Sequence, residues 1–296
     1  MMSCFCYYFV NSEYKPLKAV LLYKPTPAVE SVNNPKNVLY LNKIDYRKIN
    51  KEYRKIIETY RSFSIKVYFI NAVDIDVRYK SCLYNMMYTR DLLFITPGGV
   101  IISKMASNLR RHEVKYAKKA LIKIDIPVIM NIKNKGIFEG ADALWVNEKL
   151  IMIGVGNRTN KEGFLQIRDE LKNQGINCIQ VPAPKNTQHL LGAVQFVDSD
   201  CALLRINLID KRIVGILMEN GIKFIELSED KEVRKKQAMN VVAIAPRKII
   251  MPSDCPETKK IYQSYGIKIA AEIQMNQLIN GGGGLACATA ILSRLP

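Results

Sequence analysis

Apolar and polar segments alternate along this chain in a unit that recurs about every 50 residues. Each copy begins with an apolar run, a short turn that contains Pro, Gly, Asn or Asp, and a second apolar run. This is the pattern of a β-hairpin. Four such hairpins are predicted at residues 92–104, 143–155, 193–206 and 241–252.

A segment with helical periodicity and then a further short apolar run follow each hairpin. The helices are predicted at residues 110–124, 161–175, 211–221 and 257–266, and the strands after them at 126–132, 176–183, 222–228 and 267–273. A fifth copy is split between the two ends of the chain. Its parts are a strand at 17–25, a helix at 45–62, a strand at 65–73 and the closing segment around Cys287.

Five units of this kind predict a closed ring. Such a ring removes the outer sheet edges that invite pairing with other chains, and it leaves a central channel where the ends of the units converge. A doubly wound α/β domain also alternates helices and strands, but its crossovers require no hairpins. We therefore expect residues 1–296 to form a single α/β domain, a five-unit α/β propeller with pseudo-fivefold repeats around a central channel.

The composition is that of a folded chain, because 48% of the residues are apolar and the length of 296 residues allows a large core. Seven cysteines without a CxxC pair and two histidines give neither zinc-ligand spacing nor a disulfide framework. This cysteine usage favours a reduced, cytoplasmic location. The N-terminus lacks the pattern of a secretory signal, and no apolar run reaches the roughly 20 residues of a membrane span.

The net charge of +17 raises the question of an anionic partner. The lysines that dominate this charge are spread along the chain, and neither an arginine-rich tail nor an RNP-like aromatic motif is present. A solvated basic surface is therefore a better interpretation than nucleic-acid binding.

Polar clusters precede the hairpins at comparable places in the repeat. They are TRD at residues 89–91, FEGAD at 138–142 and QHLLG at 188–192, while Cys287 follows four glycines in the closing segment. In a closed ring, equivalent positions surround the axis, so two acids, one histidine and one cysteine would meet in a single cleft.

That grouping suits attack on a guanidinium carbon. A cysteine can act as the nucleophile, a histidine can carry the proton, and carboxylates match the donor fork of a planar guanidinium. Proteolysis would instead need an oxyanion hole and no pair of buried acids. Taken singly, each residue also fits a structural role, as a buried thiol, a core histidine or a turn-forming acid.

At this point the chain resembles the guanidino-group-modifying superfamily, which includes arginine deiminases, dimethylarginine dimethylaminohydrolases and amidinotransferases. The resemblance extends from residue 17 to residue 291, and the superfamily's five-unit propeller, the pentein fold, agrees with the repeat described above. The matching residues are TRD at 89–91, Arg110 and Arg111 ahead of Glu113, FEGAD at 138–142, IGVGNRTN at 153–160, His189 with Leu190, and GGGGLAC at 281–287.

The resemblance implies a role for each of these positions. Cys287 matches the nucleophile that forms a covalent thiouronium-like adduct, and His189 matches the residue that protonates the departing amine and then activates water. Asp91 and Glu139 match acids that bind the guanidinium, and Glu139 is also placed to orient His189.

Three further positions match substrate-binding residues of the superfamily. Asp142 fits the acid that ends an EGGD-like motif, although Ala141 replaces the second glycine here. Arg158, together with Arg111 or its neighbour Arg110, matches residues that clamp the substrate's carboxylate. The resemblance implies neither a metal nor an organic cofactor.

One difference between this sequence and the superfamily's motifs concerns the choice of substrate. Arginine deiminases and amidinotransferases resemble one another in an HxD pattern, but Leu191 stands where the second acid would be. Dimethylarginine dimethylaminohydrolases do without this acid. The hypothesis that follows is that Leu191 makes room for methyl groups on an N-substituted guanidine.

The resemblance therefore predicts a hydrolase for a guanidino compound, of the arginine or N-methylarginine type, that releases a ureido product such as citrulline. An amidinotransferase that passes the amidino group to an amine acceptor is the alternative. A non-enzymatic, ribosome-associated factor of the same fold is a third reading. The expected partner is the small-molecule guanidino substrate, with no nucleic acid and no membrane. The sequence leaves open the guanidino compound, a homodimeric state, and whether residues 25–45 form a lid or a passive surface loop.

Overall fold

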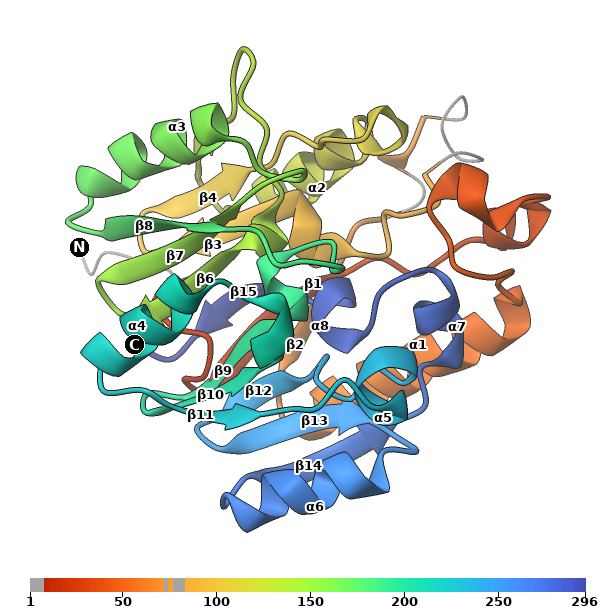
Figure 1. The fold of residues 1–296 in the computed structure, drawn as a ribbon. Coiled ribbons are helices and arrows are strands. Elements are labelled where there is room, and N and C mark those ends of the chain that lie inside the picture. The colour runs from red at the N-terminus through yellow and green to blue at the C-terminus, as the bar shows by residue number, and fades with distance from the viewer. Residues whose placement is uncertain (1–7, 72–73, 77–82) are drawn as a thin grey trace.

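The fold is described from a computed structural model, which places residues 8–71, 74–76 and 83–296 (Figure 1). Residues 72 and 73, at the end of the strand predicted at 65–73, lie outside this description. Within the described residues, the strands form five three-stranded sheets with the orders β15-β1-β2, β3-β4-β5, β6-β7-β8, β11-β10-β9 and β12-β13-β14. In every sheet the middle strand is antiparallel to one neighbour and parallel to the other.

The first unit joins the two ends of the chain. Strand β1 (Leu17–Leu22) pairs in parallel with β2 (Lys66–Phe69) and antiparallel with β15 (Ala290–Arg294). Residues far apart in sequence thus become neighbours, as where Leu21 lies opposite Ala290. The prediction of a unit split between the termini is confirmed.

The other four units each contain a hairpin and a third, parallel strand, and all four predicted hairpins are confirmed. The strands are β3 (Leu93–Thr96), β4 (Gly99–Ile102), β5 (Val128–Asn131), β6 (Ala143–Asn147), β7 (Leu150–Val155), β8 (Asn177–Pro182), β9 (Val194–Asp198), β10 (Cys201–Leu204), β11 (Lys223–Glu226), β12 (Val242–Ala245), β13 (Lys248–Pro252) and β14 (Lys268–Ile273).

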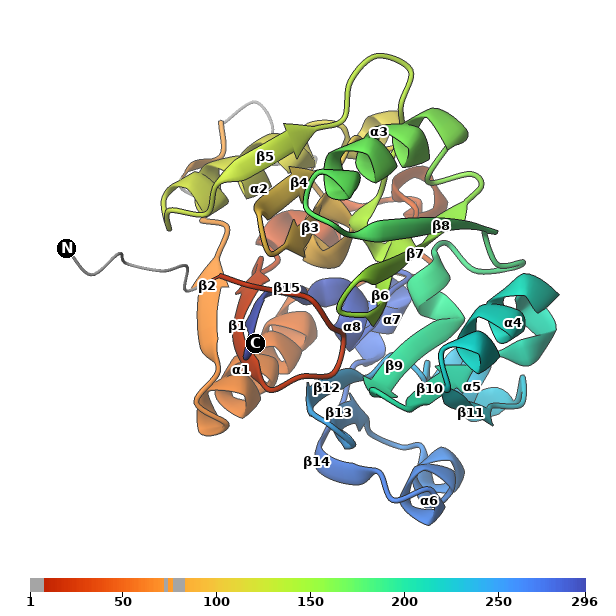
Figure 2. The same ribbon diagram turned by 90° about the vertical axis from the view of Figure 1, so that its left-hand side faces the viewer.

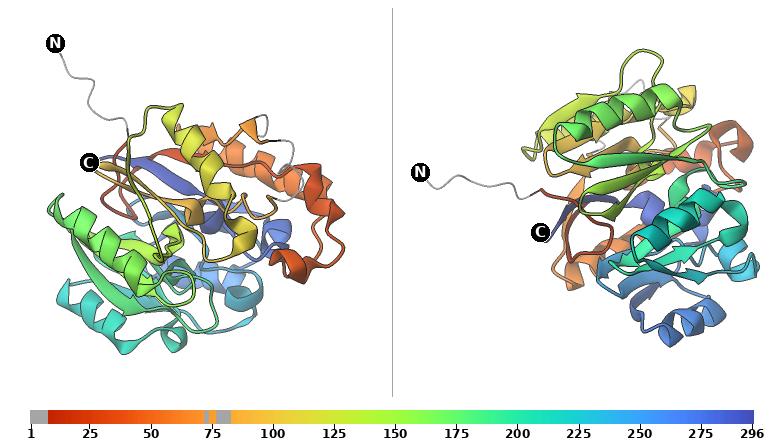
Figure 3. Two further views of the ribbon diagram at one scale, coloured as in Figure 1. Left: turned by 90° about the horizontal axis from the view of Figure 1, so that it is seen from above. Right: turned by 60° about the vertical axis from the view of Figure 1, so that its left-hand side comes forward.

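A crossover helix connects the middle strand of each sheet to its parallel neighbour. These helices are α1 (Tyr46–Ser62), α2 (Glu113–Ile122), α3 (Lys161–Lys172), α4 (Lys211–Glu219) and α6 (Pro256–Ser264). In the right-hand view of Figure 3, α3, α4 and α6 (green, teal and blue) follow one another along one side of the molecule, outside their sheets. Among the described residues, no helix is long and apolar enough to cross a membrane.

Capping side chains explain where several of these helices begin. Asp45 accepts a hydrogen bond from the Lys48 N–H at the start of α1, and Asn160 accepts one from the Gly163 N–H at the start of α3. Each cap satisfies a backbone donor that has no partner within the helix. Helix α2 begins at Glu113 and not at the predicted residue 110, because residues 108–110 form a separate 3-10 turn, η6 (Asn108–Arg110).

The core lies between the sheets and the helices that cover them. Buried tyrosines of α1 connect this helix to the centre of the molecule: the Tyr53 hydroxyl donates to the Met87 carbonyl (3.0 Å), and the Tyr60 hydroxyl bonds the Thr289 hydroxyl (2.8 Å). Met87 lies just ahead of Asp91, and Thr289 lies just after Cys287. Figure 2 shows the short helix α8 (Leu285–Ala288) near the middle of the molecule.

Candidate active site

Four of the residues singled out from the sequence lie at equivalent places in four units. Asp91 lies in the 3-10 turn η5 (Thr89–Leu92) ahead of β3, and Cys287 lies in α8 ahead of β15. Glu139 and His189 immediately precede the 3-10 turns η7 (Gly140–Asp142), ahead of β6, and η8 (Leu190–Gly192), ahead of β9. The repeat therefore delivers each side chain at the same end of its sheet.

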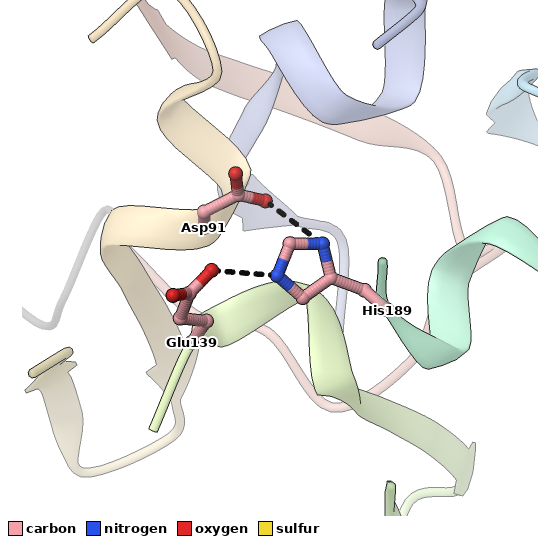
Figure 4. A group of neighbouring side chains, drawn as sticks. All are labelled: Asp91, Glu139 and His189. Atoms are coloured by element: carbon pink, nitrogen blue, oxygen red, sulfur yellow. Dashed lines mark hydrogen bonds and ion pairs between the residues drawn. The ribbon is translucent and has the colours of Figure 1, made fainter. Parts of the chain in front are cut away.

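The His189 ring lies between two buried carboxylates, as Figure 4 shows. Its Nε2 atom is 2.7 Å from Glu139 Oε2, and its Nδ1 atom is 3.7 Å from Asp91 Oδ1. Both nitrogens face negative charge, so the doubly protonated imidazolium is favoured.

The pKa of His189 reflects this arrangement. Burial alone would lower the pKa, but the charge of Asp91 and the hydrogen bond to Glu139 outweigh it and raise the pKa to about 9. For Glu139, burial would raise the pKa, but the hydrogen bond to His189 and the charges of His189 and Arg110 lower it to about 2. At neutral pH the pair is imidazolium and carboxylate.

Cys287 lines the same cavity as His189 and Asp91, a cleft of about 810 Å³. Burial and the negative charge of Asp91 raise the pKa of its thiol. Three hydrogen bonds lower the pKa: one from the backbone of Gly284, one from the side chain of Asn240, whose Nδ2 lies 3.2 Å from Sγ, and one from the backbone of Cys287 itself. The thiol is thus held with donors ready to stabilise a thiolate.

Asn240 was not predicted from the sequence, although its position carried a signal. It lies just ahead of β12, where the fourth hairpin offers the place that Asp91, Glu139 and His189 occupy in their own units. Its Oδ1 also accepts the N–H of Ala286 (2.7 Å), so one amide fixes both the sulfur and the backbone beside it.

Two substitutions of Asn240 distinguish the effect of its contact with the sulfur from that of its contact with the Ala286 N–H. Asn240→Leu removes both and leaves the buried Ala286 N–H unpaired, so we expect a roughly 10- to 100-fold loss of kcat and about 1–3 kcal/mol of stability. Asn240→Asp keeps the acceptor for Ala286 but puts negative charge near the sulfur, so we expect lost activity with a smaller loss of stability. Steady-state kinetics and thermal unfolding measure the two effects. Full activity in both variants would exclude a role for this amide in positioning the thiol.

Close contacts require three of the four glycines before Cys287, and a positive φ requires the fourth. A Cβ on Gly281 would lie 2.3 Å from the Tyr88 hydroxyl oxygen, one on Gly283 2.4 Å from the Tyr88 ring, and one on Gly284 2.6 Å from Asn240 Cγ. Gly282 has a φ of +96°, which L side chains rarely adopt. The glycines therefore let α8 approach the cleft closely.

Arg110 is buried beneath the cluster, where acids and carbonyls occupy its guanidinium. Its Nη1 lies 2.5 Å from Asp91 Oδ2, its Nε donates to Glu113 (2.8 Å), and its Nη2 donates to the Asn85 carbonyl (3.1 Å). The other Asp91 oxygen, Oδ1, accepts no hydrogen bond from the described residues although it is buried. That oxygen is an acceptor available to a ligand.

The remaining predicted residues lie around this centre. Asp142 is buried and accepts hydrogen bonds from the Thr159 hydroxyl (2.7 Å) and the Leu190 N–H (3.0 Å), so it joins the loops that carry Glu139 and His189. Burial raises the pKa of Asp142 to about 6.

The two other predicted arginines differ in their surroundings. Arg158 donates to Gln188 (3.1 Å) and to Glu139 (3.4 Å). Arg111 is exposed, and its Nε donates to His112 Nε2 (2.9 Å). Arg110 lines the cleft, whereas Arg111 and Arg158 are not among the described residues that line it. Of the adjacent pair, the structure therefore brings Arg110 to the cleft.

The rest of the cleft wall carries charge of both signs. The guanidinium of Arg205 is held by Glu229 (2.6 and 2.5 Å), and Arg234 also lines this wall. From the segment 25–45, Leu39 and Leu41 line the cleft, and the backbone N–H of Leu41 donates to the Asn280 carbonyl (2.8 Å). This segment thus forms part of the cleft wall.

A metal ion is the other cation that the cluster of acids could hold. One ligand atom each from Asp91, Glu139 and His189 lies within 4.8 Å of the others. A metal would have to displace the proton from His189, whose pKa is about 9, and Arg110 already neutralises Asp91. The arrangement fits a planar cation with N–H donors better than a metal.

Comparison with protein families identifies the group to which the chain belongs. The family model described as arginine deiminase matches residues 77–214 and 208–294. The chain belongs to the arginine deiminase family. The guanidino-group-modifying superfamily that the sequence motifs predicted is thereby confirmed.

A curated relative of this family is the arginine deiminase of Borreliella afzelii, which is 25% identical over 250 residues. The alignment covers 71% of this chain and 61% of the relative, so the chain spans less than two thirds of the length of that enzyme.

Two solved structures have the same fold. A dimethylarginine dimethylaminohydrolase from Pseudomonas aeruginosa, in a complex with citrulline, aligns with a TM-score of 0.74 at 18% identity and covers 93% of this chain and 98% of its own. An amidinotransferase of saxitoxin biosynthesis from Microseira wollei aligns with a TM-score of 0.78 at 14% identity and covers 98% of both chains.

Proposed function

We propose that this member of the arginine deiminase family is a hydrolase that cleaves a C–N bond of a guanidino compound and releases a ureido product. The observation that carries the proposal is the His189 ring, held between the carboxylates of Asp91 and Glu139 in the cleft that contains the Cys287 thiol. We infer further that residues 1–296 form one catalytic domain, and that the five sheets are the units of an α/β propeller. The shared strand pattern and the pairing of β1 with β15 support this.

Substrate binding follows from the available acceptor in the cleft. A guanidinium N–H can bond Asp91 Oδ1, which accepts no hydrogen bond from the described residues and lies 3.7 Å from His189 Nδ1. The positive charge of the bound guanidinium then lies near Cys287 and lowers the thiol pKa, opposing the effects of burial and of Asp91. Binding of the substrate therefore favours the thiolate that attacks it.

The reaction divides into two steps. The Cys287 thiol loses its proton to solvent, the thiolate bonds to the guanidinium carbon, and one C–N bond breaks as His189 gives its proton to the departing amine. The neutral imidazole then takes a proton from water. The resulting hydroxide bonds to the thiouronium carbon. The C–S bond then breaks as the new hydroxyl group loses its proton to solvent, which gives the ureido oxygen and regenerates the thiolate.

An amidinotransferase is the second candidate, because the cleft of about 810 Å³ has room for an acceptor amine. The two reactions differ in which C–N bond breaks first. In a hydrolase the ammonia or methylamine end leaves and the substrate chain stays on the cysteine, whereas in a transferase the chain amine leaves and only the amidino group stays. Membership of the arginine deiminase family favours the hydrolase. A non-enzymatic ribosome factor would have no use for the thiol and imidazolium together.

A substrate panel tests the proposal. Purified protein is incubated with arginine, monomethylarginine, dimethylarginine, agmatine and shorter guanidino acids, and the ureido product and released amine are quantified. We expect turnover of at least one compound. Product that forms only when lysine, ornithine or glycine is added would favour amidino transfer, and no product in either series would contradict both enzymatic proposals.

Leu191 lines the cleft and offers a test of substrate choice. Leu191→Asp adds a carboxylate beside the proposed guanidinium site, so we expect kcat/KM to shift by about 10-fold in favour of arginine over dimethylarginine. Leu191→Asn is the uncharged control of similar size. An unchanged ratio in the aspartate variant would remove Leu191 as a determinant of methyl-group tolerance.

A further inference from the structure

A second, smaller cavity of about 30 Å³ lies directly behind the active-site cleft. Leu191 and Gln195 line both, so these two side chains separate them. The cavity is also lined by Ala286, the residue before Cys287. Its charged lining residues are Glu13, Arg90 and Arg294, all buried, and the catalytic proposal uses none of them.

The charges around this cavity do not balance. Arg90 Nη2 bonds both oxygens of Glu13 (2.9 and 3.0 Å), which occupies the one carboxylate that lines the cavity. Arg294 bonds the backbone carbonyls of Lys15 and Ala243 and forms no ion pair with a described residue. Two guanidinium groups therefore share one carboxylate in a buried site, which leaves one excess positive charge.

The guanidinium groups also have spare donors. Arg90 Nε and Arg294 Nε are both buried, and neither finds an acceptor among the described residues. A buried N–H without an acceptor costs about 1–3 kcal/mol, and native structures contain few such groups. Here two such N–H groups belong to residues that line one cavity. This indicates that a further hydrogen-bond acceptor belongs in the cavity.

The pKa of Arg294 also shows that its charge is poorly compensated. Removal from water and the nearby charge of Arg90 lower its pKa, Glu13 partly offsets them, and the resulting pKa is about 10. Arg294 therefore remains charged at neutral pH, and the excess positive charge persists.

We propose that this cavity binds a single monovalent anion of the halide class, chloride in physiological solution, beside Arg90 and Arg294. The volume has room for one or two water-sized groups, which fits a single small anion. Water could accept hydrogen bonds from the spare donors, but it would leave the excess charge uncompensated.

The anion would stabilise the wall behind the nucleophile. Ala286 and Thr289, which flank Cys287 in sequence, both line the cavity, and Leu191 and Gln195 form the wall shared with the cleft. Halide binding therefore acts on the folded state, and the melting temperature is expected to depend on the halide concentration.

Anomalous diffraction gives the direct test, using crystals of the unaltered protein grown in sodium bromide. We expect an anomalous bromide peak in the cavity, beside Arg90 and Arg294. In solution, the melting temperature should rise by a few degrees and saturate with sodium chloride or bromide, but not with sodium gluconate at equal ionic strength. The absence of a peak in the cavity, or an equal rise in all three salts, would overturn the proposal.

Two variants compare how the melting temperature responds to halide when an arginine inside or outside the cavity is replaced. Arg294→Gln removes the excess charge, so its melting temperature should lose the halide-specific rise. Arg247→Gln removes an arginine outside the cavity that pairs with Asp198 and Asp200, and this variant should keep the rise. The same halide response in both variants would contradict a site at Arg294.

Discussion

Replacing Cys287 with serine is expected to lower kcat by at least about 1000-fold while substrate binding survives. A serine hydroxyl needs a neighbouring base to become a nucleophile, but His189 is protonated at neutral pH because its pKa is about 9. The site supplies a proton donor, which suits a thiolate and an amine leaving group and does not activate a hydroxyl. In the proposed function, substrate binding depends on Asp91 and its neighbours, which the substitution leaves unchanged.

The experiment measures kcat and KM by ureido product and binding by calorimetry. Cys178→Ser is the matched control, because Cys178 is a half-buried thiol of β8 that does not line the cleft. It should keep nearly full activity. A Cys287→Ser enzyme that retains a tenth or more of the normal rate would contradict the role of the thiol as nucleophile.

Replacing Glu139 with glutamine is the second change with a large expected effect. The amide keeps the size of the side chain but removes the negative charge 2.7 Å from His189 Nε2. Burial then lowers the pKa of His189 with less opposition, so the imidazolium is lost at a lower pH. We expect the alkaline limb of the kcat/KM profile to move down by at least about one pH unit, so the loss of rate should grow with pH and reach about 10-fold above pH 9.

The same pair predicts how stability depends on pH. The raised pKa of His189 contributes stability that is complete below its ordinary value of 6.5 and is lost as the pH rises through about 9. The lowered pKa of Glu139 contributes stability that is complete above 4.5 and is lost as the pH falls through about 2. The difference in unfolding free energy between the unaltered protein and Glu139→Gln should therefore be largest between pH 4.5 and 6.5. A difference that does not vary with pH would contradict the ion pair.

The sequence predicted the units of the fold because their signals are local. A hairpin appears as two apolar runs around a turn, and a crossover helix appears as a 3.6-residue period, so all four hairpins were identified. The closing segment around Cys287 was assigned to the first unit because it would complete the ring. In the structure this segment continues into β15, which pairs with β1. The short helices α5 (Lys231–Lys235) and α7 (Asn276–Asn280) have too few residues for a periodic signal, and neither was predicted.

The limits of sequence reasoning are clearest at Arg110 and Asn240. Arg110 and Arg111 are adjacent, and no pattern tells which of them turns inward; the 3-10 turn η6 buries Arg110 against Asp91 and leaves Arg111 exposed. Asn240 is neither an acid nor a base, so a search for reactive side chains passed over it. Its contact with Sγ depends on how closely the glycine segment lets α8 approach β12.

The measurement that tests the central claim most directly is the mass of the protein after acid quenching during turnover of the best substrate from the panel. We expect an adduct on Cys287 whose mass equals the substrate less the departing amine, and peptide mapping should locate it in the segment 281–294. The adduct should be absent from Cys287→Ser. An adduct of the amidino group alone would indicate a transferase, and turnover without any adduct on Cys287 would contradict covalent catalysis by this thiol.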